Sequence, residues 1–85
     1  MLDRVVVSRR LVGIVAEAAP DQPGLAAVAE DADLFEAGLG SMAMVKLMLS
    51  VEAAFDIAIP DADLHPDNFR TIRAIEALVA RLQGG

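Results

Sequence analysis

Residues 33–55 read DLFEAGLGSMAMVKLMLSVEAAF, and the interpretation of the whole chain starts from this stretch. Residues 42–55 contain no Gly or Pro and are rich in Ala, Leu, Met, Val, Lys and Glu, which predicts a helix. Gly38 and Gly40 give the backbone the freedom for a tight entry into that helix. A serine at a helix start can accept the N–H groups that the first turn leaves unpaired, so the plainest interpretation of Ser41 is a helix cap.

Two further helices are predicted on either side of this stretch. Residues 3–19 and 72–82 carry apolar side chains at the helical spacings of three and four, and Thr71 is expected to cap the last helix. Arg73, Glu76 and Arg81 are expected to point outward. The expected inward side chains are Val7, Leu11, Ile14, Val15 and Ala18, then Val45, Met48, Val51 and Phe55 with Leu47 beside them, then Ile72, Ile75, Val79 and Leu82.

The first connector is long and begins with a stop signal, because the prolines and glycine of residues 20–24 cannot continue a helix. Residues 25–29 have room for a short helical turn. We expect Leu34 and Phe35 to anchor the connector on the helices, because a connection of this length in a small protein needs its own buried side chains.

The second connector, residues 61–68, is polar and has room for one short helical turn. Its Asp61, Asp63, His65 and Asp67 alternate as metal ligands can. A calcium loop requires a glycine where Pro66 stands and a bidentate Glu where Ile72 stands, so we predict no metal site here. His65 lacks an evident orienting partner and is expected to be a surface or capping residue.

Length and composition favour one small helical domain spanning residues 1–85. Alanine is abundant, the only aromatic residues are three Phe, and Trp and Tyr are absent, which suits helices better than a sheet. The net charge of −6 argues against nucleic acid as a partner and favours cationic proteins.

The absence of cysteine excludes a disulfide framework and a thiolate nucleophile. No apolar run approaches the length of a membrane span, and residues 1–10 lack the pattern of a signal peptide, so a cytoplasmic protein is expected. A nucleophile elbow would need glycines where Leu39 and Ala43 stand, and no Gly-Lys-Ser or Gly-Lys-Thr phosphate loop occurs. We therefore predict no catalytic residue.

The ordered set of motifs along roughly residues 5–82 resembles the acyl or peptidyl carrier protein family. The resemblance rests on Leu34-Phe35, on Gly38-Leu39 before Ser41-Met42, and on the helix that follows. It continues through Phe55-Asp56-Ile57-Ala58-Ile59-Pro60 and through Phe69-Arg70-Thr71-Ile72 with Ile75.

The resemblance implies an all-α fold, a small four-helix bundle with three main helices, one short helix and a long first loop. It implies that Ser41, flanked by Gly40 and Met42, takes a 4'-phosphopantetheine arm from coenzyme A, transferred by a separate phosphopantetheinyl transferase. The arm holds an acyl or aminoacyl group as a thioester, so the chain is a phosphoprotein carrier, expected to be monomeric. Its implied partners are a loading ligase and downstream transferases, in fatty acid, polyketide, amino acid, nonribosomal peptide or lipid-A-type biosynthesis.

The resemblance also places partner docking on the helix after Ser41. Glu52 is the only carboxylate on that helix before Asp56, so docking is expected to depend more on apolar contact than on charge. The expected docking residues are Met42, Met44, Val45, Leu49, Glu52 and Ile59.

One departure concerns Gly40, since many carriers have Asp, or in peptidyl types His or Asp, just before the serine, and this leaves open which transferase accepts the chain. The Gly-Leu-x-Ser run, Leu47-Met48-Leu49 and Ala54-Phe55-Asp56 also resemble small stand-alone carriers loaded with single amino acids. The alternative is an unmodified helical interaction domain that acts through its Met-rich face. It would tolerate Ser41→Ala apart from a capping loss of about 1 kcal/mol.

Overall fold

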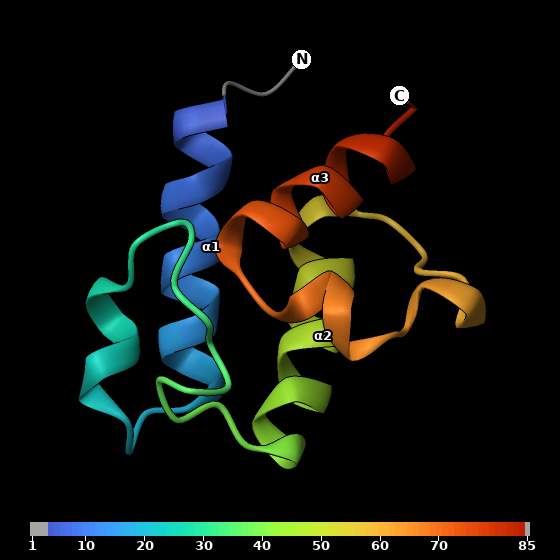
Figure 1. The fold of residues 1–85 in the computed structure, drawn as a ribbon. Helices are drawn as coiled ribbons and strands as arrows, with labels where there is room; N and C mark the ends of the chain where they lie inside the picture. Colours follow the sequence, from blue (N-terminus) through green and yellow to red (C-terminus); the bar gives the residue numbers. More distant parts are fainter. Residues whose placement is uncertain (1–3, 85) are drawn as a thin grey trace.

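Three α-helices make up about half of the computed structural model, which describes residues 4–84. They are α1 (Arg4–Ala18), α2 (Ser41–Phe55) and α3 (Ile72–Leu82), and the described residues contain no strand. The start of α1 and the end of α3 lie at the same end of the molecule (Figure 1). The all-α prediction is therefore confirmed. The sequence also predicts that the last residues, 83–85, fray. Asp3, the predicted first residue of the first helix, and Gly85 lie outside the described residues.

The connectors within residues 4–84 contain three short 3₁₀ helices, where the sequence suggested one short helical turn in each connector. These are η1 (Pro23–Ala27) in the first connector, and η2 (Asp61–Asp63) and η3 (Pro66–Phe69) in the second. The His65 Nδ1 accepts the Asp67 N–H at 3.2 Å and caps η3. Thr71 caps α3 as predicted, because its Oγ1 accepts the Ala74 N–H at 3.0 Å.

The core is formed by the facing sides of the three helices. Every residue of the stripe predicted for α1 is buried, and Phe69, Ile72, Ile75 and Val79 close the core from the other side. Fully burying one such aliphatic or aromatic side chain contributes about 1.5–3 kcal/mol. No helix within residues 4–84 has both the length and the apolar character that crossing a membrane requires.

The predicted inward face of α2 is confirmed for Leu47, Val51 and Phe55 and is wrong for Val45. Leu47 and Val51 are fully buried and Phe55 is nearly so, whereas Val45 is 53% exposed and Met48 is only partly buried. The helix is apolar on more than one side, so its own sequence does not decide whether Val45 belongs to the buried side. The positions of α1 and α3 decide this.

The predicted outward face of α3 also needs correction. Glu76 is 9% exposed and lies among the buried residues, although it was expected to point outward with Arg73 and Arg81. Leu78, which the predicted stripe omitted, is buried, and Leu82 is half-buried.

The long first connector is held against the start of α3. The Leu34 N–H donates to the Arg70 carbonyl at 2.7 Å, and the Arg73 N–H donates to the Glu30 carbonyl at 3.1 Å. Leu34 is fully buried, as predicted, and Phe35 is half-buried. These contacts fix the loop from which α2 begins.

Candidate functional site

Ser41 is the first residue of α2 and its side chain is exposed. The chain reaches it through a tight turn in which the Leu39 N–H donates to the Leu34 carbonyl at 2.9 Å. Both leucines are buried, so the turn is anchored in the core immediately before the helix begins. A rigid element therefore presents the Ser41 hydroxyl to solvent.

Gly40, and not Ser41, occupies the cap position of α2. Its φ of −82° and ψ of 174° are extended, and its carbonyl accepts the first helical bond from the Met44 N–H at 2.9 Å. Glycine has no side chain with which to cap, and no group within residues 4–84 is hydrogen-bonded to the Ser41 hydroxyl. The capping interpretation of Ser41 is thus wrong, and its side chain is left exposed.

The N-terminus of α2 provides an electrostatic environment suited to an anion. The N–H groups of Ser41, Met42 and Ala43 precede the first helical bond and have no acceptor inside the helix. The first turn of this helix carries no acidic residue. The helix dipole and these N–H groups favour negative charge at this end, and a phosphate ester on the Ser41 oxygen would benefit from both.

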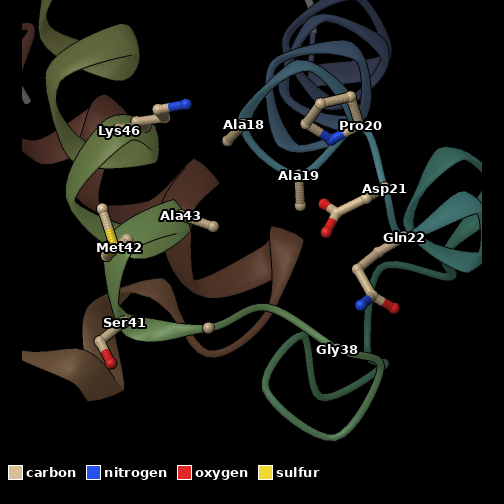
Figure 2. Close-up of a pocket in the computed structure, with 11 residues that line it drawn as sticks. Ala18, Ala19, Pro20, Asp21, Gln22, Gly38, Ser41, Met42, Ala43 and Lys46 are labelled. Atoms are coloured by element: carbon tan, nitrogen blue, oxygen red, sulfur yellow. The ribbon is translucent and has the colours of Figure 1, made fainter.

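An open groove runs beside Ser41, between the start of α2 and the end of α1 (Figure 2). Its volume is about 510 Å³. Residues from α2 form one wall, and the segment from Ala18 to Gln22 forms the other. The groove is lined by Ala18, Ala19, Pro20, Asp21, Gln22, Gly38, Gly40, Ser41, Met42, Ala43 and Lys46.

Sequence reasoning did not find the opposite wall of this groove. Asp21 and Gln22 lie some twenty residues before Ser41, and in the sequence they belong to a helix stop signal. Only the packing of α1 beside α2 brings them to the same groove.

An apolar stripe on α2 begins next to Ser41. Met42 is 83% exposed, Val45 53% and Leu49 61%, and their spacing of three and four residues places them on one side of the helix. These are three of the expected docking residues. Met44 is partly buried and packs against the core, so it lies at the edge of this stripe.

Two expected docking residues lie elsewhere. The Ile59 side chain is only 6% exposed and belongs to the core, so the structure does not bring it to the exposed stripe. The Glu52 Oε2 accepts the Ile59 N–H at 2.8 Å and holds the chain that leaves α2. Asp56 ends α2 in the left-handed conformation, with φ of 51°.

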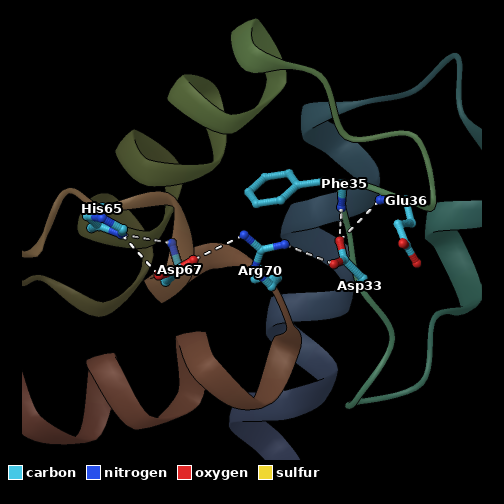
Figure 3. Close-up of polar contacts among 6 residues, drawn as sticks. All are labelled: Asp33, Phe35, Glu36, His65, Asp67 and Arg70. Carbon is cyan, nitrogen blue, oxygen red and sulfur yellow. Dashed lines mark hydrogen bonds and ion pairs between the residues drawn. The ribbon is translucent and has the colours of Figure 1, made fainter.

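Arg70 connects the loop before Ser41 to the second connector (Figure 3). Its guanidinium lies 3.1 Å from a carboxylate oxygen of Asp33 and 3.1 Å from one of Asp67, and 5.4 Å from the ring centre of Phe35. Asp33 Oδ1 also accepts the N–H groups of Phe35 and Glu36 at 2.9 and 3.1 Å.

The hydrogen bonds and charges of this cluster shift the pKa values of Asp33 and Arg70. The backbone hydrogen bond from Glu36, together with the Arg70 side chain, lowers the pKa of Asp33 below its ordinary value of 3.8. The bonds to Asp67 and Asp33 raise the pKa of Arg70. Within residues 4–84, no three side chains of His, Cys, Asp or Glu come together as metal ligands.

Comparison with known proteins gives consistent results. A family model for the phosphopantetheine attachment site matches residues 9–79. Aminoacyl carrier protein 2 of Bradyrhizobium diazoefficiens is 36% identical over 92% of this chain and 88% of its own length. The aminoacyl carrier protein of Agrobacterium fabrum is 48% identical over 68% of this chain and 70% of its own length.

A solved structure shares the fold. It contains a carrier protein from Agrobacterium tumefaciens in complex with an engineered glycine:carrier protein ligase of Bradyrhizobium japonicum and ATP. The match has a TM-score of 0.67 and 37% identity, and it covers 84% of this chain and 97% of that one.

Proposed function

Because this chain belongs to the family of phosphopantetheine-binding carrier proteins, we propose that it is an aminoacyl carrier whose arm is attached to Ser41. Members of the family are carriers and not enzymes, and their prosthetic group is 4'-phosphopantetheine. That group, when bound, supplies the thiol that a chain without cysteine lacks, and an acyl group is held on it as a thioester. We propose that this takes place in the cytoplasm and that residues 1–85 act as one carrier domain.

The observation that carries the proposal is the state of the Ser41 side chain. Its hydroxyl is exposed and takes no part in capping, on a helix whose first turn has free N–H groups and no carboxylate. When the oxygen of Ser41 attacks the β-phosphorus of coenzyme A, a new P–O bond forms to Ser41, the P–O bond of the pyrophosphate bridge breaks, and adenosine 3',5'-bisphosphate leaves. The hydroxyl proton passes to a base of the transferase. The helix N-terminus then faces the new phosphodiester anion.

Two features support an amino acid as the cargo. The matched relatives are named aminoacyl carrier proteins, and the carrier of similar fold was crystallised with a glycine:carrier protein ligase. We therefore propose that a ligase of this class loads the arm and that a phosphopantetheinyl transferase installs it.

We further propose that these partners dock on the apolar stripe of Met42, Val45 and Leu49. The exposed part of α2 carries few charges, with Lys46 and Glu52 as its only ionisable side chains. Exposed apolar side chains that cluster on one side of a helix are typical of protein interaction sites. Methionine adapts its shape to different surfaces, which suits a helix that meets several enzymes in turn.

The proposal is tested by the intact mass of the protein after incubation with coenzyme A and a broad-specificity phosphopantetheinyl transferase. We expect a gain of one phosphopantetheine in the wild type and no gain in Ser41→Ala. Because Ser41 makes no capping bond, the alanine variant should unfold within about 0.5 kcal/mol of the wild type, as exposed substitutions usually do. Retained modification in Ser41→Ala would contradict the assignment.

A Gly40→Asp variant distinguishes two explanations for a wild type that gains no mass. Either the transferase recognises the sequence around Ser41 poorly, or the protein is never modified. Modification of this variant but not of the wild type would show that Gly40 limits recognition by that transferase. If neither folded protein gains mass with several transferases, the alternative of an unmodified interaction domain replaces our proposal.

A further inference from the structure

The groove beside Ser41 has two walls of opposite electrostatic character (Figure 2). The α2 wall contains the N-terminus of the helix and the side chain of Lys46. The opposite wall, formed by the chain that leaves α1, carries Asp21, the only carboxylate among the described residues that line the groove. In Figure 2 the Asp21 side chain extends from this wall toward the space between the two helices.

We infer that this groove holds the arm of Ser41 when it carries an amino acid, and that the Asp21 carboxylate pairs with the α-ammonium group of that amino acid. The inference rests on the proposed function. It adds where the cargo lies while the carrier moves from one enzyme to the next. It adds a cargo-binding residue, Asp21, to the attachment residue.

Charge complementarity is the first argument. An arm loaded with an amino acid carries a phosphodiester anion at its attached end and an ammonium cation at its free end. The α2 wall favours the anion through the N–H groups of its first turn, and the Asp21 wall favours the cation. An arm with a simple acyl group has no cation to match Asp21.

The shape of the groove is the second argument. Its volume of about 510 Å³ lies within the range of about 300–1,000 Å³ that small-molecule sites occupy. The walls carry small side chains at Ala18, Ala19 and Ala43, which leave the space between the helices open. Ser41 lies at the edge of the groove, and in Figure 2 its hydroxyl points away from the space between the helices, so an arm attached to it has to turn around the start of α2 to enter this space.

Gln22 and Gly38 supply the third argument. Gln22 lies on the same wall as Asp21, and its amide can both donate to and accept from the amide groups of a pantetheine arm. A Cβ atom at Gly38 would lie 2.7 Å from Gln22 Oε1. The absence of a side chain at Gly38 therefore leaves room for the Gln22 amide at the edge of the groove.

The experiment loads the arm without any ligase. A phosphopantetheinyl transferase transfers the whole arm from amino-coenzyme A that carries either glycine or acetate in a stable amide linkage. The two cargoes differ only by the ammonium group. Backbone amide shifts of Ala19, Gln22 and Ala43 are then measured by NMR in the wild type, in Asp21→Asn, and in Glu17→Gln. The last variant removes an exposed carboxylate from α1 that does not line the groove.

We expect the glycyl arm to shift these amides more than the acetyl arm does in the wild type. Asp21→Asn should reduce the difference between the shift changes caused by the glycyl arm and by the acetyl arm about two- to fivefold, the range that an exposed ion pair supports. Glu17→Gln should leave this difference unchanged. Equal shifts with both cargoes, or no effect of Asp21→Asn, would overturn the inference while leaving the proposed function intact. A protein to which no arm can be attached would overturn the proposed function, and the inference with it.

Discussion

Gly38 and Gly40 stand two residues apart in the same loop, but the structure uses them differently. Gly38 has a φ of +116°, a conformation that residues with a side chain rarely adopt, and its Cα faces the Gln22 side chain. Gly40 has an ordinary extended backbone, and a Cβ there would meet no atom within 4 Å. The requirement for glycine is therefore conformational at Gly38 only.

We predict that Gly38→Ala lowers the free energy of unfolding by about 1–3 kcal/mol, the cost of holding a side-chain residue in such a conformation. In Gly40→Ala, the loss of a favourable cap residue is partly offset by a less flexible unfolded chain, so the net change should be smaller. Urea unfolding of both variants measures the difference. Equal losses would show that the positive φ of Gly38 does not cause the effect.

At the scale of the element, α2 carries apolar side chains on its exposed side as well as on its buried side. Leu47, Val51 and Phe55 occupy the side of the helix that faces the core, and Met42, Val45 and Leu49 lie outside. The helix thus has a second apolar side that the core does not bury.

We predict that Val45→Ala lowers the kcat/KM of the loading ligase for the carrier by about fivefold or more, which corresponds to the loss of about 1 kcal/mol that defines a significant interface residue. Val6→Ala is the matched control, because Val6 is equally exposed, at 55% against 53%, but lies on α1. Both variants should keep the stability of the wild type within about 0.5 kcal/mol. Equal effects on loading would contradict docking on α2.

At the scale of the whole molecule, the first connector is held to the start of α3 by contacts between residues far apart in sequence. Asp33 and Arg70 are 37 residues apart, and Arg73 forms further ion pairs with Glu30 and Asp31 at 3.2 and 2.7 Å. These contacts fix the loop that leads to Ser41. Exposed ion pairs contribute little individually, so the backbone bonds and the burial of Leu34 provide most of the attachment.

We predict that the Asp33 contribution to stability depends on pH in the acid range. Because the folded-state pKa of Asp33 lies below the unfolded value near 3.8, its stabilisation is present above that value and is lost as the pH falls through the folded pKa. Asp33→Asn should therefore destabilise the protein at pH 7 and have a smaller effect near pH 2.

Urea unfolding at several pH values measures this dependence, and Glu36→Gln serves as the control because it removes a charge from the same loop while leaving the Asp33 bonds in place. A destabilisation by Asp33→Asn that does not change with pH would show that the charge of Asp33 is unimportant.

Local signals in the sequence were sufficient for the helix positions, the Thr71 cap, the buried stripe of α1 and the place of Ser41 at the start of α2. Each depends on interactions between residues about four positions apart, and propensity, periodicity and capping describe such interactions directly. The capping role expected of Ser41 failed at this same scale, because the neighbouring Gly40 took the cap position.

Only the tertiary structure decided that Val45 lies outside the core, that Glu76 lies among core residues, and that Asp21 and Gln22 line the same groove as Ser41. A helix that is apolar on more than one side leaves the edge of its buried face undecided until its neighbours are in place. Likewise, the pairing of Asp33 with Arg70 joins segments that are distant in sequence and are brought together by packing. The sequence by itself therefore determined the elements and the position of the serine, and the packing of the three helices determined the surroundings in which that serine acts.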